Sequence, residues 1–344
     1  MRRVRVAVVG LGAIGFEHLT RLRARHWVEV AGVCDLSATL ARAVADRFDT
    51  GPAHTDAGAM LDEVRPEVVH VLTPPTSHAA LALLSLEAGA HVLVEKPIAP
   101  TLDDYVRMRE AAARHGRLLC EDYNTRFARA ALAAQAAWRA GRIGEVVSVD
   151  VAYGGVMPAE GPYADRAVPH FAHGLPGGAL QNFLTHPLSL AMPYLGGCLE
   201  VAAVQRRLVA GFGSNDELRA VLAGPRASGT ITVSGHSRPP HLVLRVRGTE
   251  GWLEADVPAG QLRVGNEGSP VTAALRRGAG ELWGGAALAG RKLAGRHDAY
   301  EGLGTLIDAF YRAVIGDAAP PVAVCEMDDV NTALHAVLHT GATA

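Results

Sequence analysis

The stretch Val4-Arg5-Val6-Ala7-Val8-Val9 runs directly into Gly10-Leu11-Gly12-Ala13-Ile14-Gly15. The first six residues have the composition of a buried strand, and the next six form the pattern G-x-G-x-x-G at the start of a helical stretch. In a turn of this kind Gly10 permits the tight bend, Gly12 lets the backbone approach a pyrophosphate, and Gly15 lets the helix pack closely on the strand. The stretch therefore predicts a dinucleotide-binding turn.

An acidic residue follows the second apolar run at the distance that this prediction requires. The run Val28–Cys34 ends at Asp35, twenty positions after Gly15. The Asp35 carboxylate can accept both ribose hydroxyls and would repel a 2′-phosphate, which predicts NAD as the cofactor. The backbone N–H groups of Ala13 and Ile14, at the positive end of the helix, are predicted to face the phosphates. A glycine-rich turn alone is a weak signal, because such turns also occur without a ligand.

Strand and helix patterns alternate over the first third of the chain. Further strands are predicted at 68–72, 91–94 and 118–121, and helices at 37–48, 76–87 and 102–115. A β-α-β series of this kind predicts a doubly wound parallel sheet, which is the Rossmann fold. We therefore predict a dinucleotide-binding Rossmann domain over residues 1–122.

The pattern changes after about Tyr123. Strands then follow one another with turn residues between them, at 146–151, 201–208, 217–223, 227–235, 242–248 and 251–255. Helices are predicted at 126–140, 179–195, 303–315 and 328–340. Such an order predicts an α/β domain with a large, mostly antiparallel sheet that has one open face. We assign residues 123–344 to this domain.

The bulk properties are those of an ordinary globular protein. The 344 residues are 49% hydrophobic and 20% charged, with a formal net charge of −2, which argues against a nucleic-acid partner. The four cysteines lie far apart without a C-x-x-C motif, so they predict free thiols in a reducing compartment. No stretch reaches the ~18 apolar residues of a membrane helix. Because Gly10 and Gly12 interrupt the first apolar run, we expect no secretory signal and predict a cytoplasmic protein without a membrane partner.

Six stretches occur in the order and at the intervals of one known family. They are V-V-G-L-G-A-I-G (8–15), T-P-P-T-S-H (73–78), E-K-P (95–97), N-T-R-F (124–127), A-G-R-I-G-E-V (140–146) and G-G-A-L-Q-N-F-L-T-H (177–186). With them the chain resembles the Gfo/Idh/MocA oxidoreductases, which include glucose–fructose oxidoreductase and inositol dehydrogenase. E-K-P together with T-P-x-x-x-H is far more specific than the glycine motif.

The resemblance implies a reaction as well as a fold. It implies hydride exchange between a nicotinamide and the C–OH or C=O carbon of a sugar, sugar derivative or polyol. It also implies that residues 123–344 bind substrate and form a homodimer or homotetramer through the C-terminal sheet. Residues of the later motifs would join the cofactor site, namely Thr73, Pro74, His78, Glu95 and Lys96.

Two residues are the main catalytic candidates. Lys96 follows a strand at its carboxyl end, where open α/β sheets bind ligands. Its charge alone would fit a solvated strand cap, but within E-K-P it resembles the lysine that polarises the reacting oxygen. His186 lies in an apolar helix, where a histidine is more often a core residue. The resemblance makes it the general base, and a neutral imidazole can take a hydroxyl proton near pH 7.

The chain departs from the family pattern next to this histidine. Four residues earlier the family commonly has Asp, whereas this chain has Asn182, and three residues later Ser189 replaces another common Asp. Asn182 and His186 are expected on one helix face. An amide can orient a substrate hydroxyl but cannot take a proton. We therefore expect Asn182 to contribute to the catalytic site and to substrate binding, in an orienting role.

Other polar residues are predicted to line the substrate site. The loop before the apolar helix contributes a partly aromatic wall, consisting of Tyr163, Arg166, His170, Phe171 and His173. His170 and His173 also form H-x-x-H, which would suit a metal with His186, but no cysteine or acidic cluster completes that set, so no metal is predicted. Asn124 and Arg126 follow the last Rossmann strand, where a substrate contact and a hinge role are equally plausible.

Two other functions remain compatible with the sequence. The first is an enzyme of the same fold that holds NAD tightly and oxidises its substrate transiently, with net epimerisation or glycosidic cleavage. The second is a cofactor-binding regulator without catalysis. Asn182 favours the regulator, whereas the presence of both Lys96 and His186 argues against it.

Overall fold

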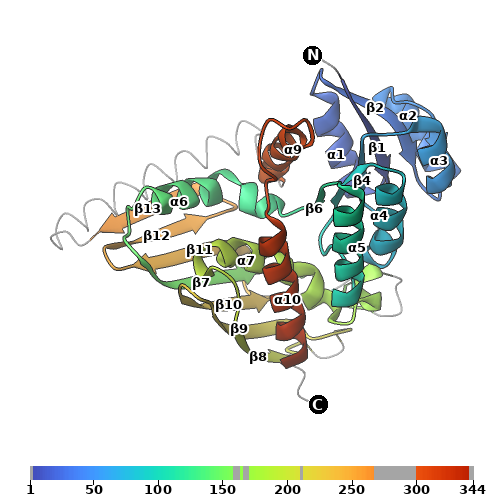
Figure 1. Cartoon of the computed structure of the whole chain (residues 1–344). Coiled ribbons are helices and arrows are strands. Elements are labelled where there is room, and N and C mark those ends of the chain that lie inside the picture. The colour runs from blue at the N-terminus through green and yellow to red at the C-terminus, as the bar shows by residue number, and fades with distance from the viewer. Residues whose placement is uncertain (1–2, 158–162, 166–169, 210–211, 267–299, 341–344) are drawn as a thin grey trace. The chain divides into compact units, whose positions relative to one another are not determined.

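The computed structural model describes residues 3–157, 163–165, 170–209, 212–266 and 300–340 (Figure 1). Arg166 lies outside these residues. The chain divides into two compact units. The N-terminal unit consists of Met1–Asp122, Gly174–Pro176 and Leu306–Met327, and the C-terminal unit consists of Tyr123–His173, Gly177–Thr305 and Asp328–Ala344.

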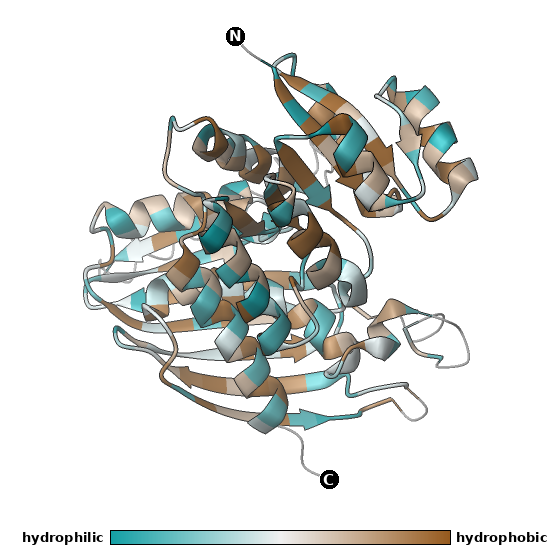
Figure 2. Ribbon diagram, turned by 45° about the vertical axis from the view of Figure 1, so that its right-hand side comes forward, coloured by the Kyte–Doolittle hydropathy of each residue, from teal (hydrophilic) through white to brown (hydrophobic). Residues whose placement is uncertain are grey.

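The N-terminal unit is built on a six-stranded parallel sheet. The strands are β1 (Val4–Val9), β2 (Val28–Cys34), β3 (Ala53–His54), β4 (Val68–Val71), β5 (His91–Val94) and β6 (Leu119–Glu121). Their order is β3-β2-β1-β4-β5-β6, and every neighbouring pair is parallel. Strands of such a sheet are apolar on both faces, because helices cover both, and Figure 2 shows these strands largely in brown. The predicted Rossmann fold is confirmed.

Helices connect these strands. They are α1 (Ala13–Arg23), α2 (Ala38–Phe48), α3 (Ala57–Val64), α4 (His78–Glu87) after the 3₁₀ turn η1 (Pro75–Ser77), and α5 (Leu102–His115). Capping side chains start α2, α3 and α5, because Ser37, Asp56 and Thr101 each accept a hydrogen bond from a backbone N–H in the first turn. By contrast, α1 starts on Gly12 without a side-chain cap. The sequence analysis did not predict β3 and α3, which are short.

A segment from the end of the chain belongs to the N-terminal unit. Helix α9 (Glu301–Val314) contributes Tyr311, whose ring packs edge-on against Trp27 at 5.3 Å between centroids. Asp308 on the same helix forms a two-point ion pair with Arg25, with contacts of 2.6 Å and 2.9 Å. The boundary proposed from sequence placed everything after residue 122 in the second domain. These long-range contacts explain why Leu306–Met327 groups with the first unit.

The C-terminal unit contains a seven-stranded sheet. Its strands are β7 (Val146–Gly154), β8 (Glu200–Arg206), β9 (Glu217–Ala223), β10 (Ser228–Ser234), β11 (His241–Gly248), β12 (Gly251–Asp256) and β13 (Gln261–Asn266). The order is β13-β12-β11-β7-β10-β9-β8, and only the pair β7–β10 is parallel. The predicted mostly antiparallel sheet is confirmed, with β13 in addition to the expected strands.

Helix α7 (Gly178–Leu195) covers one face of this sheet. Almost all of its residues are buried, and it packs on β7, β10 and β11. It ends where Gly196 adopts a left-handed conformation and donates its N–H to the Met192 carbonyl. The other helices of this region are α6 (Arg129–Arg139), α10 (Val324–Thr340) and the 3₁₀ turns η2 (Asn124–Phe127) and η3 (Phe171–Gly174).

The opposite face of the sheet is solvent-exposed and mixes apolar and charged residues. Val204 and Val221 expose 64% and 56% of their surface. Arg247 pairs with Asp150 across β11 and β7 at 2.8 Å, and Arg245 pairs with Glu254 at 2.7 Å. This is the open face that the sequence pattern predicted.

Two further expectations bear on the location of the protein. None of the described helices is long and apolar enough to cross a membrane. All four cysteines are free thiols, as expected from their spacing. Cys34 and Cys120 are buried, whereas Cys198 is half-buried and Cys325 is exposed.

The glycine turn generates a stability prediction. An added Cβ at Gly15 would lie 2.2 Å from the Gly10 carbonyl oxygen, whereas one at Gly12 would meet nothing within 4 Å. We expect Gly15→Ala to lower the free energy of unfolding by about 1–3 kcal/mol, as overpacking does. Gly12→Ala is the matched control, and urea unfolding should leave its stability near wild type. Equal stability of the two variants would contradict the tight packing at Gly15.

Candidate functional site

The predicted site residues fall into two groups, one in each unit, and each group is described within its own unit. In the N-terminal unit the glycine turn joins three chain segments. Gly10 has φ of 92°, and an added Cβ there would lie 2.7 Å from the backbone of Leu72 and Thr73 at the end of β4. Only glycine fits this position without displacing the backbone.

The same turn fits a dinucleotide phosphate. The N-terminus of α1 has no side-chain cap, so its first N–H groups, at Ala13 and Ile14, can bind an anion. Gly12 borders open space. A Cβ at this position would fill the space through which a pyrophosphate approaches the backbone.

Asp35 is held in place by the glycine turn itself. Its Oδ2 accepts the Leu11 N–H at 3.0 Å, and its Oδ1 accepts the Ser37 N–H at 2.9 Å. A carboxylate has about four lone-pair sites, so both oxygens can still accept ribose hydroxyls. The following residue, Leu36, is 95% exposed and brings no positive charge. The arrangement suits a ribose with a free 2′-hydroxyl.

His78 links the two later motifs of this unit. It is fully buried, with Nε2 at 2.6 Å from the Thr73 carbonyl and Nδ1 at 3.1 Å from the Pro97 carbonyl. Burial lowers the pKa of His78 to about 4, so the ring is neutral and donates through one nitrogen, which the shorter contact identifies as Nε2. His78 is therefore hydrogen-bonded to the end of β4 at Thr73, whereas its Nδ1, which carries no hydrogen, only packs against the Pro97 carbonyl. Thr73 is fixed further by a 2.6 Å contact between its hydroxyl and that of Ser77. Pro74 caps the 3₁₀ turn, and the Lys96–Pro97 bond is cis.

Lys96 lies beside two acidic residues. Its Nζ is 3.9 Å from Glu95 Oε1, and both side chains are largely buried. Burial, and then the charge of Asp122, raises the pKa of the Glu95 carboxyl well above its ordinary value, although Lys96 opposes this shift. A perturbed carboxyl next to a lysine at the carboxyl end of a parallel sheet is typical of a functional site.

In the C-terminal unit, α7 presents the predicted histidine to two neighbours. His186 is 8% exposed, and its Nδ1 lies 3.3 Å from the Thr125 hydroxyl. The Tyr153 ring packs edge-on against the imidazole at 5.7 Å between centroids. Sequence reasoning missed both neighbours, although Thr125 stands between the two residues that it named in N-T-R-F.

Asn182 lies one turn earlier on the same helix and contacts the aromatic wall. Its Nδ2 donates to the Tyr163 hydroxyl at 3.1 Å. Burial raises the pKa of Tyr163, so the phenol keeps its proton. The Tyr163 ring packs on His170 at 4.1 Å and on Phe183 at 5.6 Å between centroids. The structure thus brings Asn182, Tyr163 and His170 together as predicted neighbours.

The other predicted residues of this unit differ in their surroundings. Arg126 is 4% exposed. Burial raises the pKa of the Tyr194 phenol, and the charges of Arg139 and Arg126 oppose this rise, which fits a structural role for the Arg126 guanidinium. Asn124 is also buried. His173 belongs to η3, and its ring centroid lies 6.0 Å from that of His170. Ser189 is fully buried and donates its hydroxyl to the His186 carbonyl at 2.9 Å.

A buried polar cluster lies at a place that sequence reasoning did not consider. Within the described residues His18, Glu95 and Asp122 are the one group of three or more His, Cys, Asp or Glu side chains with an oxygen or ring nitrogen from each within 4.8 Å of the others. Because His18 Nε2 and Asp122 Oδ2 face each other at 3.2 Å, the cluster is hydrogen-bonded. His170, His173 and His186 form no such group. A signal existed for the first set, since His18 follows Gly15 by three residues and Asp122 directly follows a predicted strand.

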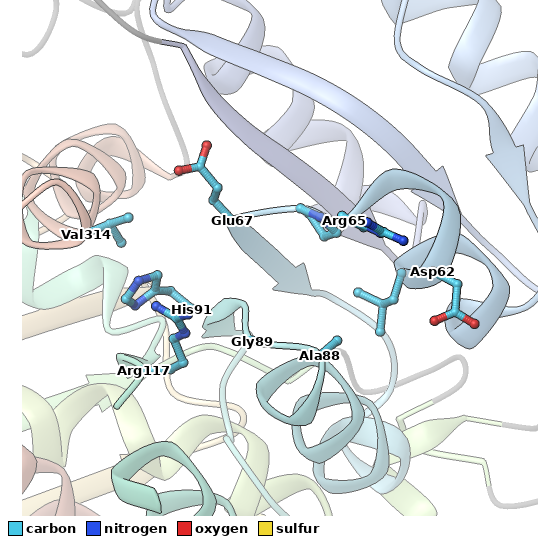
Figure 3. A pocket seen from close by; sticks show the side chains of 10 residues that line it. Asp62, Arg65, Glu67, Ala88, Gly89, His91, Arg117 and Val314 are labelled. Carbon is cyan, nitrogen blue, oxygen red and sulfur yellow. The ribbon is translucent and has the colours of Figure 1, made fainter. Parts of the chain in front are cut away.

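A recess at the amino ends of the strands in the N-terminal sheet contains none of the predicted site residues (Figure 3). It has a volume of about 750 Å³ and lies where β4 and β5 begin, beside Glu67 and His91. His91 Nδ1 accepts the Leu118 N–H at 2.9 Å, and Figure 3 shows its ring beside Arg117. Because parallel sheets bind ligands at the carboxyl ends of their strands, this recess is not the dinucleotide site.

Comparison with known protein families gives two matches. Residues 4–123 match the model described as "Oxidoreductase family, NAD-binding Rossmann fold" of GFO_IDH_MocA, and residues 131–254 match the GFO/IDH/MocA C-terminal domain. The first matched range contains the glycine turn and E-K-P, and the second contains most strands of the second sheet. NAD as the predicted cofactor is confirmed.

Three curated proteins illustrate the range of relatives. A D-glucoside 3-dehydrogenase from Escherichia coli is 36% identical over 126 residues, which are 36% of this chain and 36% of that protein. An inositol 2-dehydrogenase/D-chiro-inositol 3-dehydrogenase from Shouchella clausii is 32% identical over 168 residues, 48% of this chain and 49% of that protein. A glycosyl hydrolase family 109 protein from Akkermansia muciniphila is 31% identical over 163 residues, 44% of this chain and 34% of that protein. The chain thus spans a third to a half of the length of these relatives.

Solved structures resemble the whole chain. The WlbA dehydrogenase from Bordetella pertussis, in complex with NADH and UDP-GlcNAcA, has a TM-score of 0.80 at 22% identity, covering 99% of this chain and 96% of that one. An NAD-binding oxidoreductase from Klebsiella pneumoniae has a TM-score of 0.83 at 20% identity, with 99% and 97% covered. At these identities the similarity establishes the fold.

The geometry at Asp35 predicts a cofactor preference. Catalytic efficiency with NAD(H) should exceed that with NADP(H), because the fixed carboxylate repels a 2′-phosphate. Asp35→Asn should reduce the ratio of catalytic efficiency with NAD(H) to that with NADP(H), because it removes the charge while retaining an acceptor for the Leu11 N–H. Steady-state kinetics with both cofactors measure this. Equal or better efficiency of wild type with NADP(H) would refute the assignment.

Proposed function

This chain belongs to the Gfo/Idh/MocA oxidoreductase family, and on that premise we propose that it is an NAD-dependent dehydrogenase. The proposed substrate is a sugar, sugar derivative or polyol, with hydride exchanged between a hydroxyl or carbonyl carbon and the nicotinamide. The observation that carries the proposal is the glycine turn with its uncapped helix and its anchored Asp35. The names of the sugar and inositol dehydrogenases among the relatives support the substrate class.

Within this proposal each unit has its own role. Residues 1–122 bind the dinucleotide through Gly10, Gly12, Gly15 and the motifs that end at Lys96, and residues 123–344 bind substrate. The open face of the second sheet carries the contacts of a homodimer or homotetramer. The exposed Val204 on β8 and Val221 on β9, together with the ion pair between Arg247 and Asp150 on β11 and β7, support an interface on that face.

Lys96 polarises the reacting oxygen in the proposed mechanism. An ammonium group stabilises the negative charge that develops on a hydroxyl oxygen as its proton leaves, and it does so most strongly in a site of low dielectric constant. The largely buried Lys96 side chain supports this role. Bound NAD supplies the hydride acceptor for oxidation.

His186 takes the hydroxyl proton. If the neutral ring donates Nδ1–H to the Thr125 hydroxyl, Nε2 is left as the basic nitrogen, so Thr125 fixes the tautomer in place of a carboxylate. Asn182 cannot take a proton. We propose that it orients a substrate hydroxyl beside Tyr163, with His170, His173, Asn124 and Arg126 as further candidates for the substrate wall.

A second candidate function is supported by one relative. The name of the glycosyl hydrolase family 109 protein supports glycosidic cleavage as the net reaction. That is one outcome of the alternative in which the enzyme keeps NAD bound and oxidises its substrate only transiently. Purified protein distinguishes the two, in an NADH assay over inositols, aldoses, nucleotide sugars and aminosugars. Net NADH with released cofactor supports the dehydrogenase, whereas retained NAD with product but no net NADH supports the alternative.

The role of Lys96 generates a kinetic prediction. Lys96→Ala should lower turnover by ~10²-fold or more, within the range for positioned electrostatic and proton-transfer groups. Lys96→Arg, which keeps the charge, should lose less. Cofactor affinity, measured by NADH fluorescence, should change little. Near-normal turnover of Lys96→Ala would make this lysine a structural cation.

The pair on α7 generates a pH prediction. Oxidation should slow as pH falls and His186 becomes protonated. Asn182→Asp should move this acidic limb to higher pH, because a nearby negative charge favours the imidazolium form. Asn182→Ala is the uncharged control, and its limb should stay in place. If the acidic limb of the pH profile does not move in a folded Asn182→Asp variant, the two side chains do not share the site. If the acidic limb survives in His186→Ala, another residue is the base.

A further inference from the structure

A buried chain of polar side chains leads to the carboxyl beside Lys96. The Tyr311 hydroxyl lies 3.0 Å from His70 Nε2, and His70 Nδ1 lies 2.8 Å from His18 Nδ1. His18 Nε2 in turn lies 3.2 Å from Asp122 Oδ2. All four side chains are fully buried. One ring nitrogen of His18 and one carboxyl oxygen from each of Asp122 and Glu95 lie within 4.8 Å of one another.

The positions of the hydrogens in this chain follow from the contacts. Both rings are neutral, since burial lowers the pKa of His18 to about 3 and that of His70 well below its ordinary value. Burial also raises the pKa of Tyr311, so the phenol keeps its hydrogen and donates it to His70 Nε2. The hydrogen of His70 is therefore on Nδ1 and is donated to His18 Nδ1. His18 must then carry its hydrogen on Nε2 and donate it to Asp122.

The reverse arrangement satisfies fewer groups. A His18 ring protonated on Nδ1 would direct a bare Nε2 at Asp122, which would then need to be protonated itself. His70 would donate Nε2–H to the Tyr311 oxygen, so the Tyr311 hydrogen would lose the imidazole acceptor. Leaving a buried donor unsatisfied costs about 1–3 kcal/mol. The first arrangement therefore fixes Asp122 as a carboxylate.

An ionised Asp122 determines the state of Glu95. One oxygen of the Glu95 carboxyl lies within 4.8 Å of one oxygen of Asp122, and a hydrogen bond with Asp122 contributes to the raised pKa of Glu95. Two carboxylates only accept, so a bond between them requires one hydrogen. Because Asp122 already accepts from His18, the hydrogen belongs on Glu95. Burial and the Asp122 charge both favour this protonated form of Glu95.

The protonation of Glu95 matters because Lys96 Nζ lies only 3.9 Å away. An ionised Glu95 would hold the ammonium in an ion pair and oppose its attraction to the reacting oxygen. We propose that Tyr311, His70, His18 and Asp122 act as a chain of positioning residues that keeps a proton on Glu95 and thereby leaves the charge of Lys96 to the reacting oxygen. This inference rests on the role proposed above for Lys96.

The first test measures the tautomers and does not depend on activity. Nitrogen-15 NMR of the histidine-labelled full chain, with signals assigned through His18→Gln and His70→Gln, reports which ring nitrogen carries hydrogen. We expect His18 to be protonated on Nε2 and His70 on Nδ1 at neutral pH. A His18 ring protonated on Nδ1, or on both nitrogens, would overturn the inference.

The second test uses pH profiles of kcat. The charged or titratable groups around Glu95 are Asp122, Lys96 and His18. In Asp122→Asn the amide oxygen can still accept from His18, while the amide N–H donates to an ionised Glu95. Removing the negative charge lets Glu95 lose its proton at lower pH. We expect the alkaline limb to move to lower pH and kcat at neutral pH to fall about tenfold or more, with little change in NADH affinity.

Two further variants keep this test decisive. Glu121→Gln is the matched control. Glu121 is a buried carboxylate at the end of β6, directly before Asp122, and its Oε1 accepts the Ile98 N–H, so the alkaline limb should not move in this variant. Glu95→Gln mimics the protonated form and can still donate to Asp122. Because a glutamine at position 95 cannot lose a proton, the alkaline limb that Glu95 causes should disappear, and kcat should stay high to higher pH. This variant decides the question if Asp122→Asn does not fold.

The outcomes separate this inference from the proposed function. Near-normal turnover of Lys96→Ala would refute the role of Lys96, whereas the tautomers would still report on the chain of hydrogen bonds. If Lys96→Ala is impaired but a folded Asp122→Asn variant keeps the wild-type limb, the dehydrogenase proposal stands and the positioning chain is wrong.

Discussion

The close backbone contact at the glycine turn is the constraint on which the N-terminal unit depends. Gly10 lies against the backbone of Leu72 and Thr73, and Gly15 lies against the Gly10 carbonyl, at distances that no side chain could occupy. The end of β1, the start of α1 and the end of β4 therefore meet without side chains between them. An uncapped helix N-terminus is thus held at the carboxyl edge of the sheet, together with the anchored Asp35. The close backbone packing at these glycines therefore also places the groups that recognise the cofactor.

Burial of polar groups is the second organising feature of this unit. His18, His70 and His78 are fully buried, and burial lowers the pKa of each, so they act as neutral donors and acceptors of fixed direction. A buried polar group is stable only when its hydrogen bonds are made, because desolvation is otherwise uncompensated. The pair His18–His70 meets this requirement between Asp122 and Tyr311, and His78 meets it at the nitrogen that donates to the Thr73 carbonyl. The polar interior thereby fixes the surroundings of Lys96.

Much of the architecture could be predicted from the sequence. The helix 102–115 and the strands 91–94 and 217–223 have the predicted bounds, since strong periodicity and end signals define them locally. Short elements such as β3 and α3 were missed, because two to eight residues give too few positions to establish a period. Among the predicted site residues, Asn182, Tyr163 and His170 are neighbours in the structure, whereas Arg126 is buried beside Tyr194. A charged residue after a strand gives no local sign of which way its side chain turns.

The sequence by itself determined the fold class, the family and the dinucleotide turn, because each of these depends on residues close together in the chain. Glycine spacing, alternation of apolar residues and the motif E-K-P are all local patterns. The tertiary structure alone decided that Thr125 contacts His186, that Tyr311 enters the N-terminal unit and that His18 bonds to both His70 and Asp122. Those contacts join residues 52 to 241 positions apart. Burial and hydrogen-bond direction arise only when distant segments pack together, so protonation states such as that of Glu95 are properties of the fold and cannot be derived from local sequence.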